Sequence, residues 1–121
     1  MAATEIDKSF ARLVRLAKKL KLEGVEAGTT YDSAPALRVS DRPFASIKEA
    51  GVMVLHCPHD AKEMLMEMAP EIYFQTPHFE GWPGLMVRLA AISDEELALR
   101  LENAWRFKAP KRLAAKRPMA R

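Results

Sequence analysis

The stretch from Pro70 to Trp105 constrains the fold most, because it holds two strands, a loop and a helix in immediate succession. Its second strand lies at residues 85–89, where Leu, Val and Leu alternate with other types. The loop before that strand, residues 76–84, contains two prolines and two glycines and is therefore irregular. A helix follows, because Ser93 to Glu96 has the form of a capping box, in which each residue's side chain accepts from the other's N–H.

The remaining chain predicts a β-rich region between two amphipathic helices. Four strands are expected at residues 25–31, 36–39, 44–48 and 52–56, with connections so short that neighbouring strands must be antiparallel. Apolar residues at helical spacing predict a helix of about 16 residues before them, ended by Gly24, and another between Pro58 and Pro70. The expected fold is two-layer α+β, in the order α-β-β-β-β-α-β-β-α, with the helices packed on one face of an antiparallel sheet.

Length and composition indicate one domain. The chain has 121 residues, and about half of them are hydrophobic, which suffices for a single core. A single cysteine excludes an internal disulfide framework. No run approaches the ~20 apolar residues of a membrane span, and the first residues do not resemble a secretory signal, so we expect a cytoplasmic protein without membrane contact. We expect residues 1–110 to form the domain and residues 111–121 to form a flexible basic tail.

Positive charge is concentrated at the C-terminal end. Residues 106–121 carry a formal charge of +7, which leaves −4 on the first 105 residues because the whole chain carries +3. A basic tail of this kind is often a solvated arm, and it is also a candidate for binding nucleic acid. The candidates for neutralising phosphates lie at this end, on the hairpins and on the open sheet face: Arg38, Arg42, Lys48, Arg88, Arg106, Lys108, Lys111 and Arg112.

The predicted N-terminal helix also has a basic face. Its basic residues follow one another at spacings of four, three and four: Lys8, Arg12, Arg15 and Lys19. Such a ridge is usually solvated, and the functional alternative is that it contacts phosphates.

One short segment combines residue types that are common in chemical sites. His56-Cys57-Pro58-His59 offers two imidazoles and a thiol, but zinc requires four ligands and the chain has only one further histidine and no further cysteine. Cys57 near a helix start is a conceivable nucleophile, yet it ends an apolar strand and no oxyanion arrangement can be named. We therefore expect no metal, no cofactor and no catalytic residue, and we assign the methionines of the second helix to the core.

The irregular loop is the second candidate for function. Loops held by a rigid sheet often carry function, so this loop is a candidate recognition surface for a protein or a small ligand. The residues that would form the surface are Tyr73, His78, Phe79 and Trp82. His78 and Glu80 could also form a pair for acid–base chemistry. The structural alternative is that the aromatic residues fold back on the sheet and that His78 bonds to the backbone.

The chain resembles the MmcQ/YjbR family of small α+β proteins over roughly residues 8–113. The resemblance rests on residues 70–74 (PEIYF), 76–79 (TPHF), 81–83 (GWP), 87–89 (VRL), 93–97 (SDEEL), 104–105 (AW) and 109–113 (APKRL). Gly24-Val25-Glu26 and residues 54–57 fit less specifically. The chain departs from the family pattern at Glu23, where a proline is usual, and at Ser40-Asp41-Arg42, where a glycine-rich turn is common. The family is described as predicted DNA-binding, with a double-wing motif.

The resemblance and the charge distribution together imply a small non-enzymatic protein that binds DNA through basic residues, as a monomer or a weak homodimer. The alternative is a protein-interaction or small-ligand module that uses the aromatic loop from Tyr73 to Trp82.

Overall fold

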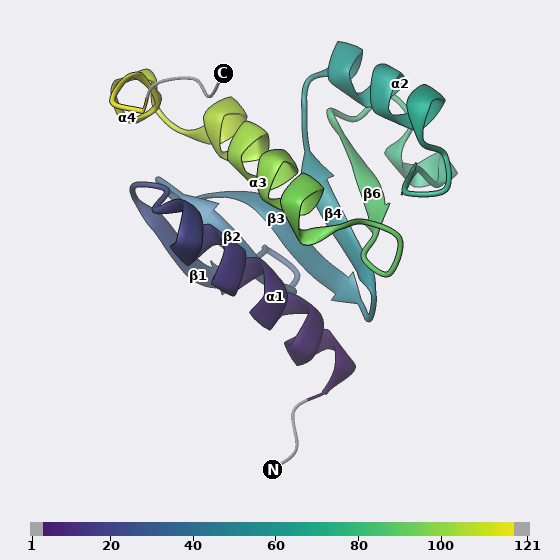
Figure 1. Ribbon diagram of the computed structural model, residues 1–121, viewed down its shortest axis with the longest axis horizontal. Coiled ribbons are helices and arrows are strands. Elements are labelled where there is room, and N and C mark those ends of the chain that lie inside the picture. The colour runs from purple at the N-terminus through teal and green to yellow at the C-terminus, as the bar shows by residue number, and fades with distance from the viewer. Residues whose placement is uncertain (1–3, 118–121) are drawn as a thin grey trace.

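The computed structural model describes residues 4–117, which form one open sheet with helices packed against it (Figure 1). In chain order the elements are α1 (Glu5–Leu20), β1 (Val25–Thr29), β2 (Pro35–Val39), β3 (Arg42–Glu49), β4 (Val52–His56), α2 (His59–Met68), β5 (Tyr73–Phe74), the 3-10 turn η1 (Pro77–Phe79), β6 (Gly84–Arg88), α3 (Asp94–Lys108) and α4 (Lys111–Ala115). The predicted α+β order is confirmed, and the short α4 follows it.

The sheet is antiparallel throughout, in the order β1-β2-β3-β4-β6-β5. Helices α1 and α3 lie side by side across one face, and α2 packs beside β5 and β6 at the other end (Figure 1). One core joins the three helices to this face, and it includes Leu13 of α1, Leu65 of α2 and Leu101 of α3. The sheet face covered by the helices is therefore the predicted hydrophobic layer, but the assignment of the α2 methionines to the core was wrong for Met64 and Met68, which are 52% and 73% exposed.

The opposite face of the sheet carries one row of residues in register across all six strands. The row contains Gly28, Ala36, Ser46, Val54, Met86 and Phe74. The neighbouring row, which includes Leu37, Ala45, Leu55 and Leu85, points into the core, because successive side chains of a strand alternate between faces. We call the face with Ser46 and Val54 the open face.

The ends of α1 follow simple capping rules. The Thr4 hydroxyl accepts from the Asp7 N–H at 3.0 Å, and the Asp7 carboxylate accepts from the Thr4 N–H, so a capping box starts the helix. The helix has the predicted 16 residues, but Lys21, with φ of 56°, is the left-handed residue that ends it. Gly24 also has positive φ and lies three residues further on.

The turn between β2 and β3 explains one departure from the family pattern. Ser40 and Asp41 both have positive φ, 48° and 65°. A two-residue hairpin turn of this kind favours glycine, and aspartate is among the residues that tolerate it. The chain therefore forms the tight turn without a glycine.

The predicted capping box of α3 is only half formed. The Ser93 hydroxyl accepts from the Glu96 N–H at 3.1 Å, as expected. The Glu96 carboxylate instead accepts from the Tyr73 hydroxyl, because Tyr73 of β5 points into the core beside the first turn of α3. The Glu96 carboxylate thus bonds to the Tyr73 hydroxyl and not to the Ser93 N–H, as it would in a complete capping box.

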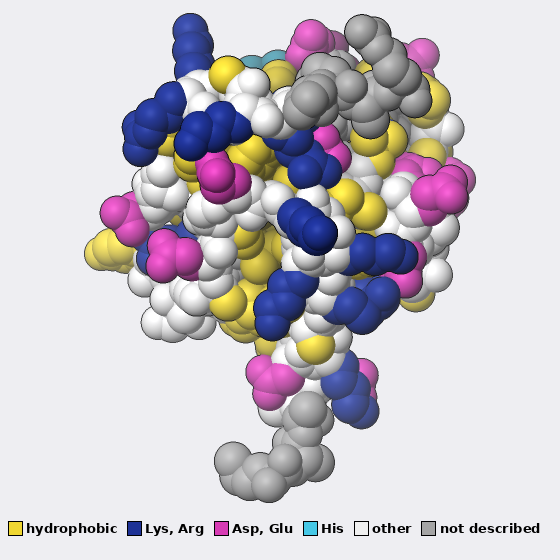
Figure 2. Space-filling model, turned by 60° about the vertical axis from the view of Figure 1, so that its left-hand side comes forward, with side chains coloured by type: hydrophobic (Ala, Val, Ile, Leu, Met, Phe, Trp, Pro, Cys, Tyr) yellow, Lys and Arg dark blue, Asp and Glu magenta, His cyan; other side chains and the backbone are white. Residues whose placement is uncertain are grey.

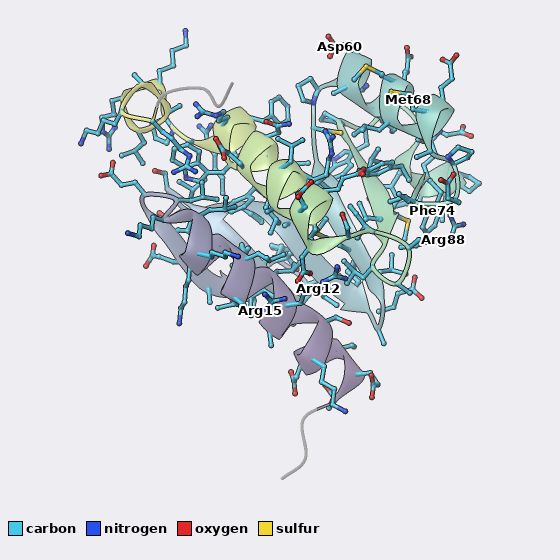
Figure 3. The ribbon with its side chains drawn as sticks, viewed as in Figure 1. Arg12, Arg15, Asp60, Met68, Phe74 and Arg88 are labelled. Carbon is cyan, nitrogen blue, oxygen red and sulfur yellow. The ribbon has the colours of Figure 1, made fainter. Side chains whose placement is uncertain are left out.

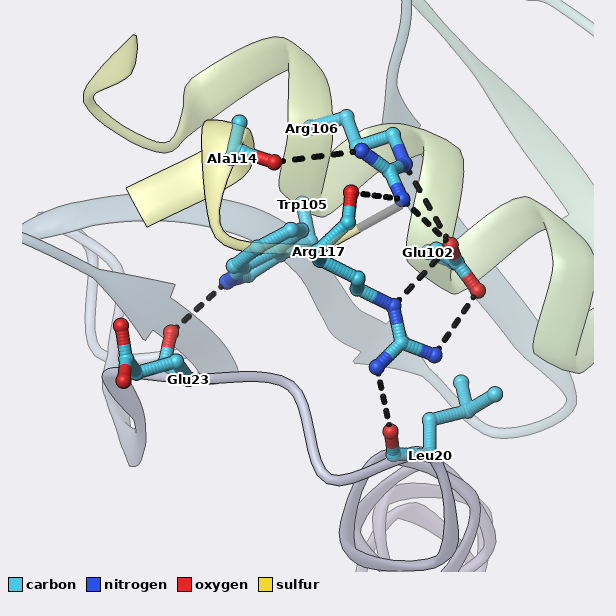
Figure 4. A network of polar contacts seen from close by, with 7 residues as sticks. All are labelled: Leu20, Glu23, Glu102, Trp105, Arg106, Ala114 and Arg117. Atoms are coloured by element: carbon cyan, nitrogen blue, oxygen red, sulfur yellow. Dashed lines mark hydrogen bonds and ion pairs between the residues drawn. The ribbon is translucent and has the colours of Figure 1, made fainter. Parts of the chain in front are cut away.

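The segment after α3 packs on the body through a charged network (Figure 4). Glu102 is 12% exposed and receives Arg106 at 3.0 Å and Arg117 at 3.1 Å. Arg117 also donates to the Leu20 carbonyl at the end of α1. The two guanidinium groups, Arg117 above all, hold the pKa of Glu102 below its usual value. Residues 111–117, expected to begin the tail, are thus joined to α1 and α3, while residues 118–121 lie outside the described residues.

Candidate functional site

A hollow of about 320 Å³ lies on the open face of the sheet. Its floor is formed by β3 and β4, one wall by the loop after β1, and the other wall by the aromatic loop between β5 and β6. We call it the sheet-face hollow, and its lining residues are Thr30, Tyr31, Asp32, Pro43, Ser46, Lys48, Val54, His56, His78, Phe79 and Trp82. The aromatic loop thus folds back onto the sheet, and three of its predicted residues, His78, Phe79 and Trp82, meet at one site.

Trp82 is positioned by a glycine on the neighbouring strand. A Cβ atom at Gly84 would lie 2.0 Å from Cζ3 of Trp82, so only glycine leaves room for the indole at this place. The indole also contacts His56 and Phe79 edge to face, at centroid distances of 4.7 and 5.2 Å. Gly81, with φ of 77°, forms the turn that brings the indole back to the sheet.

A buried lysine fixes the aromatic loop from behind. Lys62 of α2 is only 4% exposed, and its Nζ donates to the carbonyls of Phe79 and Trp82 at 2.7 and 2.8 Å. The Cys57 N–H donates to the Pro83 carbonyl at 3.2 Å. The bonds from Lys62 add to the backbone bonds that the Phe79 and Trp82 carbonyls accept from the Trp82 and Gly84 N–H groups, and they hold the wall of the hollow against α2.

Charged and polar groups of the hollow are largely matched with one another. Lys48 and Asp32 form an ion pair at 2.6 Å, and the Thr30 hydroxyl donates to Asp32 at 2.6 Å. The bond to Lys48 is the main reason why the pKa of Asp32 falls to about 2. Ser46 is 4% exposed on the floor, and its side chain has no hydrogen-bond partner within residues 4–117.

Burial keeps the two titratable groups at the end of β4 uncharged at neutral pH. Desolvation, with a smaller contribution from Lys108, lowers the pKa of His56 to about 4, so the imidazole is neutral. Burial raises the pKa of the Cys57 thiol to about 11, so almost no thiolate forms near pH 7. The environment of Cys57 therefore disfavours its use as a nucleophile.

Tyr73, which we predicted in the same recognition surface, does not take part in it. It is 2% exposed, points to the helix-covered side and donates its hydroxyl proton to Glu96. The neighbouring residue Phe74 faces the other side, because side chains alternate along β5. His78 lines the hollow, but no hydrogen bond joins it to Glu80 within the described chain.

The basic residues predicted on the open sheet face are engaged within the protein. Arg88 lies 4.0 Å from the Phe74 ring centroid and donates to the Pro70 carbonyl at 3.1 Å (Figure 3). Arg38 lies along Gly28 and donates to the Asp41 carbonyl at 2.7 Å. Lys48 is paired with Asp32. These three cations stabilise turns and loops, and a phosphate would have to compete with those interactions.

The basic ridge of α1 contains both residues that are bonded within the protein and a residue that is not. Arg12 donates to Asp94 and to the Leu89 and Ile92 carbonyls, each at 2.7 Å, and Arg15 pairs with Asp94 at 2.8 Å (Figure 3). These bonds tie α1 to the start of α3, and both arginines lower the pKa of Asp94. Toward the other end of the ridge, Lys19 is exposed and has no ion-pair partner within residues 4–117.

Exposed cations gather where α1 ends and α4 begins. Figure 2 shows dark blue side chains along α1 and over the α4 end of the same face, with acidic side chains between some of them. We call this the cationic end and define it by exposed residues that form no ion pair within the described chain: Lys18, Lys19, Lys21, Arg42, Lys111 and Arg112.

The sheet register and the packing of α4 place these segments together. In the sheet, Arg42 of β3 is paired with Val39 of β2, and Val39 is paired in turn with Val25, the first residue of β1. The short connection from α1 to β1 contains Gly24, and Leu113 of α4 lies over this glycine. Three of these cations were predicted from the sequence as phosphate contacts: Arg42, Lys111 and Arg112. Lys18 and Lys21 were missed, because the predicted ridge continued from Arg15 to Lys19 and Lys21 lies beyond the last residue of α1. Lys108 lies 5.2 Å from the Phe107 ring, and Arg106 belongs to the Glu102 network.

Neither a membrane-spanning helix nor a metal centre occurs within residues 4–117. No helix in this range is long and apolar enough to cross a membrane. No group of three or more His, Cys, Asp or Glu side chains in it is arranged to hold a metal ion.

The fold defines a small α+β protein with an open antiparallel sheet, and sequence comparison gives its family. The YjbR family matches residues 20–107, so the chain belongs to the YjbR family. The "Uncharacterized protein Rv2570" of Mycobacterium tuberculosis and the "Uncharacterized protein Mb2600" of Mycobacterium bovis are each 44% identical over 52 residues. That alignment covers 43% of this chain and 40% of each relative. No solved structure matches this chain.

Proposed function

We propose that this YjbR-family protein is a non-enzymatic, cytoplasmic protein that binds the phosphate backbone of DNA through its cationic end, as a monomer or a weak homodimer. The observation that carries the proposal is the placement of six exposed cations from α1, the β2–β3 turn and α4 at one end of the molecule. None of the six is neutralised by an ion pair within residues 4–117. Cations of this kind release counterions from DNA when they bind it.

Internal bonding decides which cations are available. Arg38, Lys48, Arg88 and Arg106 already donate to carbonyls or carboxylates of the protein. Replacing those bonds by a bond to phosphate would cost the interaction within the protein, whereas Lys18 and Lys21 would lose only hydration. The proposed interface therefore keeps Lys111 and Arg112 of the predicted C-terminal set and Arg42 of the hairpin, adds Lys18, Lys19 and Lys21 of α1 and its cap, and leaves out Arg38, Lys48 and Arg88.

Fluorescence anisotropy with a labelled duplex at several salt concentrations tests the proposal. If about four phosphates are neutralised, the logarithm of the association constant should fall with the logarithm of salt concentration at a slope of about −3.6. The double variant Lys18→Gln/Lys21→Gln should make the slope shallower by about 0.9 for each phosphate that it no longer neutralises. A slope near zero, or no binding at micromolar protein in low salt, would remove the proposal.

A matched variant separates local interactions from net charge. Lys8→Gln/Arg88→Gln removes the same charge, but Lys8 pairs with Glu5 at the other end of α1 and Arg88 lies beside Phe74. We expect this variant to bind DNA nearly as wild type does. Equal weakening by both double variants would show that net charge, and not the cationic end, governs binding.

Point substitutions are preferable to truncation after Ala109. Truncation would also remove Leu113 from Gly24 and Arg117 from Glu102, and so would disturb the core around Trp105. Loss of DNA binding by a truncated chain would then have two explanations.

A further inference from the structure

The sheet-face hollow has no part in the proposed DNA interface. The cationic end lies where α1 stops and α4 begins, whereas the hollow lies on the open face between the loop after β1 and the aromatic loop. At about 320 Å³, the hollow falls at the lower end of the range that small-molecule sites occupy, roughly 300–1,000 Å³. Its aromatic wall is already fixed by Lys62 and Gly84, so binding would not have to order that wall.

We propose that the sheet-face hollow binds an uncharged, planar heteroaromatic compound of one or two fused rings. The shape, the charge balance and the hydrogen-bonding groups of the hollow each support this class.

Aromatic side chains stand on both sides of the hollow. Phe79 and Trp82 form one wall in an edge-to-face arrangement at 5.2 Å, and Tyr31 lies on the loop opposite. Tyr31 is fully exposed, so its ring is hardly packed against the rest of the protein. An exposed aromatic ring beside a cavity is available to cover a flat ligand, and stacking of rings is favourable beyond the area that it buries. These walls favour a planar ring over a flexible chain.

The charges in the hollow favour an uncharged ligand. Lys48 and Asp32 neutralise each other at 2.6 Å, and His56 carries no charge near pH 7. An ionic ligand of either sign would compete with one member of this pair for the other. The hollow therefore offers an ionic ligand no unmatched countercharge to offset the hydration that the ligand loses on binding.

A neutral polar group on the floor favours a heteroaromatic ring over a pure hydrocarbon. Ser46 is buried beneath the hollow without a side-chain partner in the described chain, so its hydroxyl is free to donate to or accept from a ring nitrogen. The neutral imidazole of His56 lies in the same lining. Its Nδ1 atom is buried without a hydrogen-bond partner within the described residues, whereas buried polar groups normally find one, and an N–H group of the ligand is the kind of donor that Nδ1 lacks.

Calorimetric titration of the full chain with indole and adenine tests the class of ligand. Indole-3-acetate and tryptamine serve as the anionic and cationic counterparts. We expect at least one uncharged probe to bind with a dissociation constant of about 1 mM or below, and both charged probes to bind about tenfold more weakly. No saturable binding of either uncharged probe, or tighter binding of a charged probe, would overturn the proposal.

Two variants locate the site. Tyr31→Ala changes a fully exposed side chain and so should not affect folding, and it should weaken binding roughly fivefold because the stacking ring is removed. Ser46→Ala should weaken binding by a similar factor through loss of one hydrogen bond. Leu99→Ala, on an exposed position of α3, is the control and should bind as wild type does. Binding that is insensitive to both Tyr31→Ala and Ser46→Ala would place the ligand elsewhere and refute the assignment.

Discussion

Lys62 Nζ donates to the carbonyl oxygen of Trp82 at 2.8 Å and so joins the interior of α2 to the wall of the sheet-face hollow. A lysine that is 4% exposed is unusual, because burying an amino group is costly unless it is hydrogen-bonded. The bonds to Trp82 and Phe79 provide that compensation, and the same bonds hold the aromatic loop against the sheet.

We predict that Lys62→Met lowers the free energy of unfolding by about 1–3 kcal/mol. Methionine fills a similar volume but removes the amino group, so the carbonyls of Phe79 and Trp82 keep only the backbone bonds from the Trp82 and Gly84 N–H groups. Urea unfolding followed by circular dichroism measures the change. Lys19→Met, at an exposed position of α1, is the matched control and should change stability by less than about 0.5 kcal/mol. Equal stability of the two variants would show that the buried bonds contribute nothing.

Gly84→Ala should displace the indole of Trp82. The new methyl group would lie 2.0 Å from Trp82 Cζ3 and 2.8 Å from the Leu55 carbonyl oxygen, and the backbone atom cannot move aside easily. We expect a loss of about 1–3 kcal/mol of stability and weaker protection of Trp82 from fluorescence quenching by acrylamide. Trp105 is fully buried and should be quenched little in either protein.

Gly28→Ala is the control for that substitution. A Cβ atom at Gly28 would lie 3.1 Å from Cδ of Arg38, a side chain that can shift by a few tenths of an ångström. We expect its tryptophan quenching to equal that of wild type. If stability and tryptophan quenching of Gly84→Ala also equal those of wild type, the close approach of Trp82 to β6 does not require glycine at position 84.

Stability should decrease with falling pH because of His56. Its pKa is about 4 in the folded protein, against 6.5 for an ordinary histidine, so the unfolded chain binds more protons between these values. The free energy of unfolding should therefore fall by about 2 kcal/mol as pH drops from 6.5 to 4. Asp32 and Lys48 line the same hollow, and Asp32 keeps its charge throughout this interval because its pKa is about 2.

His56→Phe tests this assignment. Phenylalanine keeps an aromatic ring beside Trp82 but cannot be protonated. The difference in stability between wild type and His56→Phe should change by about 2 kcal/mol between pH 6.5 and pH 4, since contributions from other groups cancel. A difference that stays constant over this interval would contradict the lowered pKa of His56.

Glu102→Gln should release the segment that contains α4. The substitution leaves Arg106 and Arg117, with side chains only 15% and 29% exposed, without their carboxylate. We expect a loss of about 2 kcal/mol of stability and faster hydrogen exchange of residues 111–117. Glu5→Gln breaks the exposed pair with Lys8 and should cost less than about 0.5 kcal/mol. Unchanged exchange in Glu102→Gln would show that the network does not hold α4.

The strands and helices were predictable because their periodicity and turns are local features of the sequence. Alternation correctly placed Arg38, Lys48 and Arg88 on the side of the sheet away from the helices. Their partners were not predictable, because the Asp41 and Pro70 carbonyls and Asp32 approach them only through strand pairing and loop geometry.

The hollow was predictable in part. The composition of residues 76–84 indicated an aromatic loop on a rigid sheet, and the structure places His78, Phe79 and Trp82 in the lining of the hollow. The prediction for Tyr73 was wrong, since a two-residue strand sends adjacent side chains to opposite faces and no sequence pattern showed where β5 began. Lys62 was missed, because a lysine on the polar side of a predicted helix gives no sign that two loop carbonyls lie above it.

Backbone amide chemical shifts recorded during titration with duplex DNA show directly whether the cationic end is the DNA interface. We predict that the largest changes fall at the C-terminal turn of α1, the β2–β3 turn and the start of α4, around Lys18, Lys21, Arg42 and Lys111. Changes confined to the open sheet face, around Arg38, Lys48 and Arg88, or no changes in low salt, would contradict it.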